Sequence, residues 1–194
     1  MSDNQITSVV LSGVGGQGIL LASEITANTA MLADFDVKTN EVHGMAQRGG
    51  SVLAQIRYGK KVYSPLVAKG TAKVLVALEQ IEALRFSDYL APGGVAVVNS
   101  QAIIPVTVSS GAAKYPQNVR QKLEDVFDKL VFIDAAKIAI EAGNIRAANV
   151  VLLGAMSNHL DLPIDCWLKA IESAVKDKYA ELNKKAFYAG RDYK

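Results

Sequence analysis

Cysteine is almost absent from this sequence: Cys166 is the only one among 194 residues. One cysteine cannot form a disulfide within the chain, and the sequence has no Cys-x-x-Cys run that could bind an iron–sulfur cluster. Any iron–sulfur cluster that works with this protein must therefore be held by another chain.

The sequence also lacks a strong charge and a long hydrophobic run. Its formal net charge is +2, and its lysines and arginines are scattered rather than clustered with aromatic residues, which argues against a nucleic-acid-binding surface. The longest apolar run, residues 150–156, is far too short to cross a bilayer, and the first five residues show no signal-peptide pattern. We therefore expect a cytoplasmic protein with neither a nucleic-acid nor a membrane partner.

The composition is that of one compact domain. Half of the positions are apolar, at 50%, so a chain of this length can bury a sizeable core. No segment rich in proline, glycine and serine divides the sequence, and no internal repeat is visible. We expect residues 1–194 to form a single domain.

The most informative segment is Gly-Val-Gly-Gly-Gln-Gly at residues 13–18, between an apolar run and an apolar helical stretch that starts at Ile19. A strand that turns tightly on glycines into a helix directs backbone N–H groups and the positive end of the helix at one point, which suits a phosphate or carboxylate. Glycines are equally suited to a purely structural turn, so both interpretations stay open. The candidate ligand-contacting residues are Gly13, Gly15, Gly16, Gln17 and Gly18.

Strand and helix patterns alternate along the first two thirds of the chain, and helical patterns fill the rest. Strands are expected at residues 35–42, 51–58, 74–78, 95–98 and 131–133. A tight turn at 59–60 is expected to join strand 51–58 to residues 61–64 as a hairpin, and residues 92–94 to interrupt the chain of elements before strand 95–98. Helices are expected at 79–90, 117–130, 135–142 and 147–160, near Pro163, and in a tail ending at Gly190. This order predicts an α/β fold with three layers (α/β/α), a mostly parallel, mixed sheet and a helical C-terminal third.

A second glycine-rich loop, residues 43–50, follows the second expected strand. It carries one guanidinium and several backbone donors, and the candidate ligand-contacting residues are Arg48, Gly49 and Gly50. The alternative interpretation is a solvent-exposed connection between two strands. His43 has no Ser, Cys or second His partner at a catalytic or metal-binding spacing, so no catalytic residue and no metal site are expected.

An independent nucleotide-binding enzyme is the competing hypothesis. A nicotinamide-binding domain needs an acidic residue at the end of its second strand to hold the ribose hydroxyls, and Glu41 is the only candidate. The segment after Glu41 predicts another strand instead of a crossover helix, so the expected order of elements breaks there. Asn149 is interpreted as an amide at a helix N-terminus, with Gly154 permitting close backbone contact.

Several of these segments together resemble the gamma subunit, or third domain, of 2-oxoacid:ferredoxin oxidoreductases. The run around Arg48 is most similar to the small (beta) subunit of the indolepyruvate:ferredoxin oxidoreductases. The resemblance spans nearly the whole chain. It rests on residues 13–19, 43–52 and 76–79, on Asn149 with residues 153–155, and on Asn183 with residues 186–187.

This resemblance implies a subunit of a complex that oxidatively decarboxylates a 2-oxoacid such as indolepyruvate, pyruvate or 2-oxoglutarate. The family's thiamine motif, Gly-Asp-Gly followed by Asn-Asn, is missing here. Thiamine diphosphate and the iron–sulfur clusters are then expected on larger partner subunits, which pass electrons to ferredoxin. The resemblance further implies that the two glycine-rich loops face the partner, coenzyme A, or both. Because the chain has a single cysteine and lacks the thiamine motif, we expect it to be inactive in isolation. Its two glycine-rich loops then leave a surface that a partner normally covers, so we expect the isolated chain to form a homodimer.

Overall fold

The computed structural model describes residues 6–44, 49–112 and 114–193. The strands are β1 (Thr7–Val14), β2 (Asp36–His43), β3 (Ser51–Gly59), β4 (Ala72–Ala77), β5 (Leu90–Asn99) and β6 (Leu130–Ile133). The α-helices are α1 (Ile19–Leu32), α2 (Gln80–Arg85), α3 (Val106–Ser109), α4 (Val119–Val126), α5 (Ala135–Ala142), α6 (Ala148–Ser157), α7 (Ile164–Ala174) and α8 (Ala180–Arg191). Short 3-10 helices lie at η1 (Ser87–Tyr89), η2 (Ile145–Ala147) and η3 (Asp177–Tyr179).

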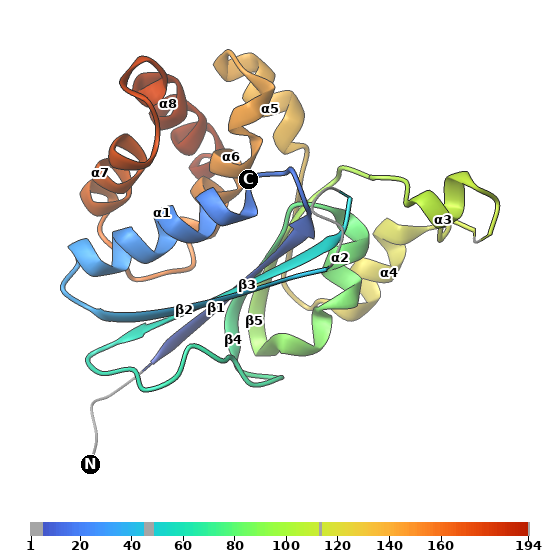
Figure 1. Cartoon of the computed structure of the whole chain (residues 1–194), viewed down its shortest axis with the longest axis horizontal. Coiled ribbons are helices and arrows are strands. Elements are labelled where there is room, and N and C mark those ends of the chain that lie inside the picture. The colour runs from blue at the N-terminus through green and yellow to red at the C-terminus, as the bar shows by residue number, and fades with distance from the viewer. Residues whose placement is uncertain (1–5, 45–48, 113, 194) are drawn as a thin grey trace.

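The strands form one mixed sheet in the order β2-β3-β1-β4-β5-β6 (Figure 1). Parallel pairing joins β1 to β4, β4 to β5 and β5 to β6, while β3 runs antiparallel to both β1 and β2. The carboxyl ends of β1, β4, β5 and β6 therefore meet at one edge of the sheet, where open α/β folds bind their ligands.

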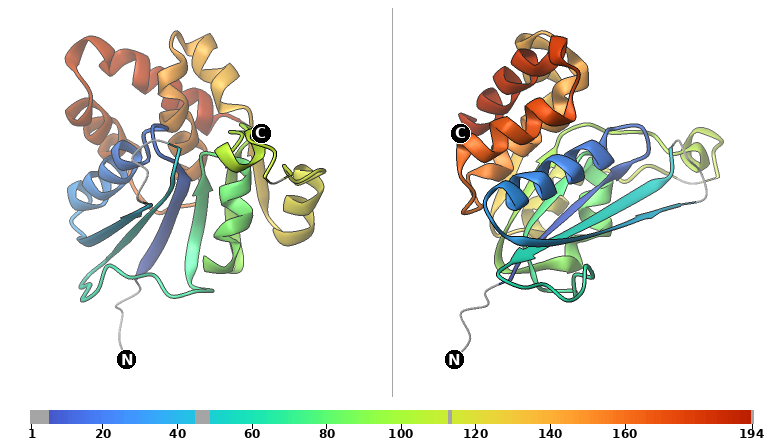
Figure 2. Two further views of the ribbon diagram at one scale, coloured as in Figure 1. Left: turned by 45° about the vertical axis from the view of Figure 1, so that its right-hand side comes forward. Right: turned by 60° about the vertical axis from the view of Figure 1, so that its left-hand side comes forward.

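Helices cover both faces of the sheet, which confirms the predicted three-layer α/β/α fold. One core contains apolar side chains of α1, α5, α6, α7 and α8 packed on the sheet, and a smaller core lies under α2 and α4. Figure 2 shows the C-terminal helices gathered on the same side of the sheet as α1. The predicted helical C-terminal third thus forms most of one layer.

The thick helical layer depends on a close crossing of α6 and α8. A Cβ added at Gly154 would lie 2.0 Å from the Phe187 carbonyl oxygen, and one added at Gly190 would lie 1.9 Å from the Val151 oxygen. Any side chain at either position would clash with backbone. The close contact expected at Gly154 is therefore confirmed, and its partner is α8.

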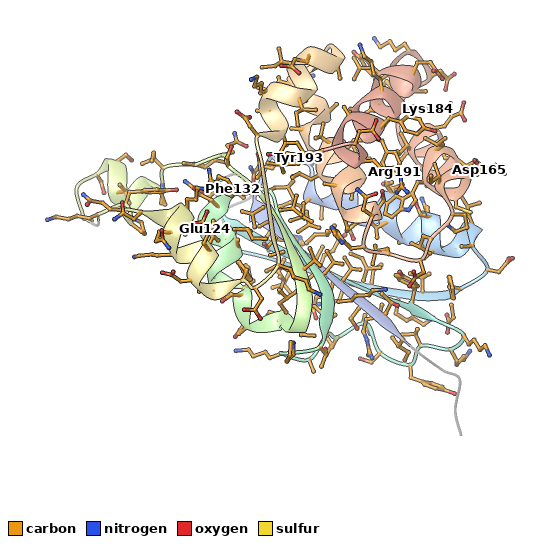
Figure 3. The ribbon with its side chains drawn as sticks, turned by 180° about the vertical axis from the view of Figure 1, so that it is seen from behind. Glu124, Phe132, Asp165, Lys184, Arg191 and Tyr193 are labelled. Atoms are coloured by element: carbon orange, nitrogen blue, oxygen red, sulfur yellow. The ribbon has the colours of Figure 1, made fainter. Side chains whose placement is uncertain are left out.

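The last residues of the chain tie this layer to the sheet and to α6 (Figure 3). The Tyr193 hydroxyl donates a hydrogen bond of 3.0 Å to the Phe132 carbonyl oxygen, which belongs to β6. The Arg191 guanidinium donates to the Ser157 hydroxyl at 2.8 Å, and Asn158 donates to the Arg191 carbonyl oxygen. These bonds hold α8 in place against the end of α6.

Two predicted details are wrong. Residues 61–64 form no strand, because side chains take up their backbone groups: Val62 N–H donates to Asp36, and the Ser64 carbonyl accepts from Arg57. The antiparallel hairpin in this region is β2–β3 instead. Residues 92–94 do not form a break before the next strand either. They belong to β5, which begins at Leu90, and a register irregularity between β4 and β5 accommodates them.

The structure also shortens two predicted helices. The helix expected at 79–90 ends at Arg85 and is followed by η1, and β5 starts at the position where that helix was expected to end. The helix expected at 117–130 ends at Val126, because Phe127 is extended and buried in the smaller core. Burial of an aromatic ring here overrides the helical periodicity.

Candidate functional site

The first glycine-rich loop connects β1 to α1 at the carboxyl edge of the sheet. Gly16 and Gly18 have φ angles of 105° and 80°, which side chains rarely adopt. A Cβ at Gly18 would also lie 2.6 Å from the Asn149 amide nitrogen, and one at Gly13 would lie 2.8 Å from the Gln17 oxygen. Gly13 and Gly18 are thus required by packing, whereas a Cβ at Gly16 would meet nothing within 4 Å.

Gln17 holds the loop together through its side-chain amide. Its oxygen accepts from the Val14 N–H at 2.7 Å, and its nitrogen donates to the Leu78 carbonyl at 2.8 Å and to the Gln101 oxygen at 3.0 Å. Both hydrogens of the amide nitrogen are engaged in these two bonds. Gln17 therefore positions the loop against β4 and the segment after β5.

The two glycine-rich loops lie side by side. Gly15 N–H donates to the Gly50 carbonyl at 2.8 Å, and Gly49 N–H donates to the Gly15 carbonyl at 3.3 Å. The antiparallel pairing of β1 with β3 brings them together, because β3 begins at Ser51 opposite Val14. Arg48, the charged residue predicted in the second loop, lies outside the described residues, so its predicted role stays a prediction.

Asn149 links the first loop to α6. Its oxygen accepts from the Val150 N–H at 2.9 Å, which confirms an amide serving the start of the helix. Its nitrogen also donates to the Gly18 carbonyl at 3.1 Å, a contact that the sequence pattern did not indicate. Asn149 is 5% exposed, and it fixes the N-terminus of α1 relative to α6.

A hollow of about 390 Å³ opens on one side of the glycine loop; we call it the polar hollow. It lies between the N-terminal turns of α1, α5 and α6 and the ends of β4 and β5. Four carboxamides and one guanidinium line it, together with apolar atoms. These polar residues are Gln17, Asn99, Gln101, Asn149 and Arg146, and Gly16 and Gly18 complete the wall beside the loop.

A second hollow, of about 480 Å³, lies on the other side of the same loop; we call it the apolar hollow. His43 is its only polar side chain among the described lining residues. Leu20 is 50% exposed here, so a large apolar side chain faces solvent in this chain. The remaining lining residues are Gly15, Gly16, Gly18, Ile19, Leu21 and Val52.

Two buried carboxylates near the loops serve the fold. Glu79 accepts from the N–H groups of Ile81 and Glu82 at the start of α2 and from Ile103 N–H. The hydroxyl of Tyr115 also donates to Glu79, and burial raises the pKa of that hydroxyl. Glu82 accepts from Ser51 and from Arg85, which anchors the start of β3. Each acid has the partners that burial requires.

Sequence analysis missed Asn99, Gln101 and Arg146. Asn99 ends β5 and is 2% exposed. An amide at the carboxyl end of an apolar strand pattern was the sequence signal that could have identified it. Gln101 and Arg146 occupy short connections that carry no recognisable pattern. Within the described ranges, no group of three His, Cys, Asp or Glu side chains is placed to hold a metal ion, and no helix is long and apolar enough to cross a membrane.

The nucleotide-binding alternative meets a topological obstacle. The order β2-β3-β1 places β3 between the glycine loop and the strand that carries Glu41. In a dinucleotide-binding fold, the acidic residue follows a strand adjacent to the one that precedes the glycines. Glu41 is also exposed, on the strand at the edge of the sheet. Its carboxylate therefore cannot hold the hydroxyls of a ribose bound at the glycine loop.

The fold and the loops at its carboxyl edge define a class of mixed α/β domains with a glycine-rich turn into the first helix. The family model described as pyruvate ferredoxin/flavodoxin oxidoreductase matches residues 8–193. The chain is 42% identical to the indolepyruvate oxidoreductase subunit IorB of Pyrococcus horikoshii over 188 residues, which are 94% of this chain and 93% of that protein. The chain belongs to the pyruvate ferredoxin/flavodoxin oxidoreductase family.

Solved structures agree with this placement. The keto/oxoacid ferredoxin oxidoreductase gamma subunit from Geobacter sulfurreducens matches with a TM-score of 0.69 and 26% identity, covering 95% of each chain. The 2-oxoglutarate:ferredoxin oxidoreductase from Magnetococcus marinus, solved with 2-oxoglutarate, coenzyme A and succinyl-CoA, matches with a TM-score of 0.71. That match has 18% identity and covers 97% of this chain but 31% of that one, so it shows the shared fold alone.

Proposed function

We propose that this chain is the small subunit of a 2-oxoacid:ferredoxin oxidoreductase of the indolepyruvate type. The observation that carries the proposal is the 42% identity to the Pyrococcus horikoshii IorB subunit along nearly the full length of both proteins. In this assignment the reaction is the thiamine-dependent oxidative decarboxylation of a 2-oxoacid, with ferredoxin as electron acceptor and an aryl pyruvate as the preferred substrate.

The redox cofactors belong to larger partner subunits in this proposal. A single cysteine cannot ligate an iron–sulfur cluster, and the chain lacks the Gly-Asp-Gly thiamine motif. The small subunit then acts through its surfaces, by binding the larger subunit and controlling access of coenzyme A to the active site. A cytoplasmic location is part of this proposal.

The joined glycine-rich loops are the surface proposed to face the partner or coenzyme A. Gly15, Gly49 and Gly50 are tied together by hydrogen bonds, while a Cβ at Gly16 or Gly49 would meet nothing within 4 Å. Their backbone is therefore open to an approaching group. Leu20, half exposed beside the same loop, adds an apolar contact that suits a protein partner.

Reconstitution with the larger subunit tests the assignment. The tagged chain should co-purify from its native host with a large chain that carries Gly-Asp-Gly and several cysteine clusters. The complex should reduce ferredoxin with indolepyruvate faster than with pyruvate or 2-oxoglutarate. Recovery of the chain without such a partner, together with no 2-oxoacid-dependent reduction, would contradict the proposal.

The isolated chain provides a second test. It should be colourless and inactive with every 2-oxoacid, and it should self-associate as a dimer through the surface that the larger subunit covers. An absorbance band near roughly 400 nm, where thiolate-ligated clusters absorb, would contradict the placement of the clusters on the partner. A strict monomer with no affinity for the larger subunit would contradict the subunit assignment.

Arg48 is proposed to pair with a phosphate or carboxylate at the subunit boundary. Arg48→Lys keeps the charge but loses the bidentate geometry, so it should weaken assembly or coenzyme A use by about 1–3 kcal/mol. Arg48→Ala should do the same or more while leaving the free energy of unfolding unchanged. If Arg48→Ala alters neither assembly nor the Michaelis constant for coenzyme A, this role is wrong.

A further inference from the structure

The two edges of the sheet differ in how they are protected (Figure 1). At one edge, β6 has four residues, and the Tyr193 hydroxyl donates to the Phe132 carbonyl oxygen of this strand. At the other edge, β2 has eight residues, contains no proline and pairs with β3 without a register irregularity. Natural sheets protect a long edge with prolines, bulges or a covering segment. Of these devices, β2 has neither a proline nor a bulge.

The hydrogen-bond pattern of β2 identifies the backbone groups that face away from β3. Gly44 N–H donates to the Ser51 carbonyl oxygen at 3.1 Å, and this pair continues the β2–β3 register one step beyond the end of β2. In an antiparallel pair, residues bonded to the neighbouring strand alternate with residues directed to the other side. Four residues of β2 are thus directed outward, and their N–H groups donate to no group among the described residues. They are Val37, Thr39, Glu41 and His43.

Apolar side chains flank this edge on both faces of the sheet. On the face that α1 covers, the half-exposed Leu20 lines the apolar hollow together with His43. Val42 lies on the opposite face, since side chains alternate along a strand, and it is 54% exposed. The edge therefore offers apolar contacts beside its outward backbone groups.

The charges of β2 limit how a second copy of the strand could pair with it. Two identical antiparallel strands related by a two-fold axis are centred on a residue, because opposite residues must both face the contact or both face away from it. Centring the pair on Lys38 or on Glu41 would place like charges directly opposite each other, which is destabilising. Any centre other than Asn40 also leaves at least one outward residue of β2 without an outward partner in the second strand.

Asn40 is the middle of residues 37–43, so a pair centred on it uses every outward residue. Val37 then faces His43 of the second copy, Thr39 faces Glu41, and each such pair exchanges two hydrogen bonds. On the opposite face of the sheet, Lys38 faces Val42 of the second copy, and no charged residue of β2 meets its like. The aliphatic stem of a lysine can cover an apolar side chain while its ammonium stays in water. The strand is therefore complementary to itself in this one register.

We propose that β2 is the contact of a symmetric homodimer, in which two copies pair antiparallel about Asn40 and continue one sheet through both chains. The pairing gives the outward N–H and C=O groups of β2 partners and covers Val42 on each chain. Because His43 also lines the apolar hollow, the proposal specifies the surface of the dimer expected for the isolated chain, and to that extent it rests on the proposed function.

Disulfide trapping in the full-length chain tests the register, with Cys166→Ser as the background because Cys166 is the only native cysteine. Asn40→Cys should give a covalent dimer under mild oxidation, because the Cα atoms of a non-hydrogen-bonded pair are about 4.5 Å apart, which a disulfide spans. Lys38→Cys and Val42→Cys are the matched controls on the same face of β2. Each alone should react about tenfold more slowly, since the same residue of the second copy lies several positions away along the strand. A mixture of the two should form the mixed disulfide as fast as Asn40→Cys dimerises.

Sedimentation equilibrium measures the strength of the pairing in variants that keep the native cysteine. Val42→Lys places an ammonium opposite Lys38 of the second copy, whereas Val42→Glu places a carboxylate there. The dissociation constant of the dimer should be about fivefold higher for Val42→Lys than for Val42→Glu. Thr39→Pro removes an outward N–H where an edge strand tolerates proline, so it should raise the constant about tenfold over Thr39→Val, which keeps the N–H. Circular dichroism and the urea midpoint establish that each variant is folded.

The proposal is overturned if the unmodified chain stays monomeric at every concentration, or if Asn40→Cys is trapped no faster than Lys38→Cys and Val42→Cys. Equal dissociation constants for Val42→Lys and Val42→Glu would also overturn it. If the chain does not dimerise but Thr39→Pro abolishes binding of the larger subunit, the edge serves that subunit and the proposal is wrong. Ferredoxin reduction by the complex of unmodified subunits does not depend on any of these outcomes, so failure of the dimer is distinguishable from failure of the proposed function.

Discussion

The two hollows share Gly16, Gly18 and Leu21 but differ in the side chains that surround them. The polar hollow is bounded by one guanidinium and four carboxamides, those of Arg146, Gln17, Asn99, Gln101 and Asn149. The apolar hollow is bounded by the exposed side of α1 and the start of β3, with Leu20 half exposed. One glycine loop thus separates a hollow lined by amides from a hollow lined mainly by apolar side chains.

The largest expected effect comes from Gly154→Ala, which should force apart the α6–α8 crossing behind the polar hollow. The new Cβ would lie 2.0 Å from the Phe187 oxygen, so α6 must move away from α8 and carry Asn149 with it. We expect a loss of about 3 kcal/mol in the free energy of unfolding, measured by urea denaturation.

Gly70→Ala is its control, because Gly70 has a φ of 73° and open space around it. That variant should show only the backbone cost of the left-handed conformation, roughly 1–2 kcal/mol. Equal losses in the two variants would mean that the α6–α8 crossing tolerates a side chain.

Gln17→Glu should affect both hollows, since Gln17 holds the loop between them. The carboxylate loses both donors, and it faces the Leu78 carbonyl and the Gln101 oxygen. We expect a destabilisation of about 2 kcal/mol in the same assay, because the new carboxylate faces the Leu78 carbonyl oxygen with no hydrogen to donate to it. Gln121→Glu, on the exposed face of α4, is the control and should change stability little. A stable Gln17→Glu variant would show that the loop keeps its shape without this amide.

Leu20→Asp should disrupt the apolar hollow alone. Its side chain is exposed in this chain, so the free energy of unfolding should stay within about 0.5 kcal/mol. Affinity for the larger subunit should fall by about 1.5 kcal/mol, because apolar contact is lost at the proposed interface. Met31→Asp, at the far end of α1 and 59% exposed, is the matched control. Equal affinities for the two variants would remove the apolar hollow from the interface.

The smallest effect concerns His159, which follows the far end of α6 and lines neither hollow among the described residues. Burial lowers the pKa of His159 below its ordinary value, and Lys129 and Lys73 lower it further. The folded state therefore binds this proton less well than the unfolded state does. The free energy of unfolding should fall slightly as the pH drops below about 6.5 and keep its full value above it.

His159→Gln should flatten this dependence in urea denaturation between pH 5 and pH 7. An unchanged slope in the variant would assign the dependence to other groups.

Much of the fold followed from local patterns. Alternation of strands and helices predicted the three layers, and glycine, proline and apolar periodicity located the C-terminal helices to within a few residues. Failures occurred where distant partners decide the local structure. Residues 61–64 form no strand because Asp36 and Arg57 bind their backbone, and Phe127 leaves its helix to enter the core.

The sequence by itself determined that the loop at residues 13–18 turns from a strand into a helix, because glycine alone adopts the required φ angles without strain. Only the tertiary structure decided what surrounds that loop. Asn149 bonds to Gly18 across 131 positions, and Gln17 bonds to Gln101 across 84. No local pattern encodes such pairs, because it is the order of the strands and the α6–α8 crossing that brings them together.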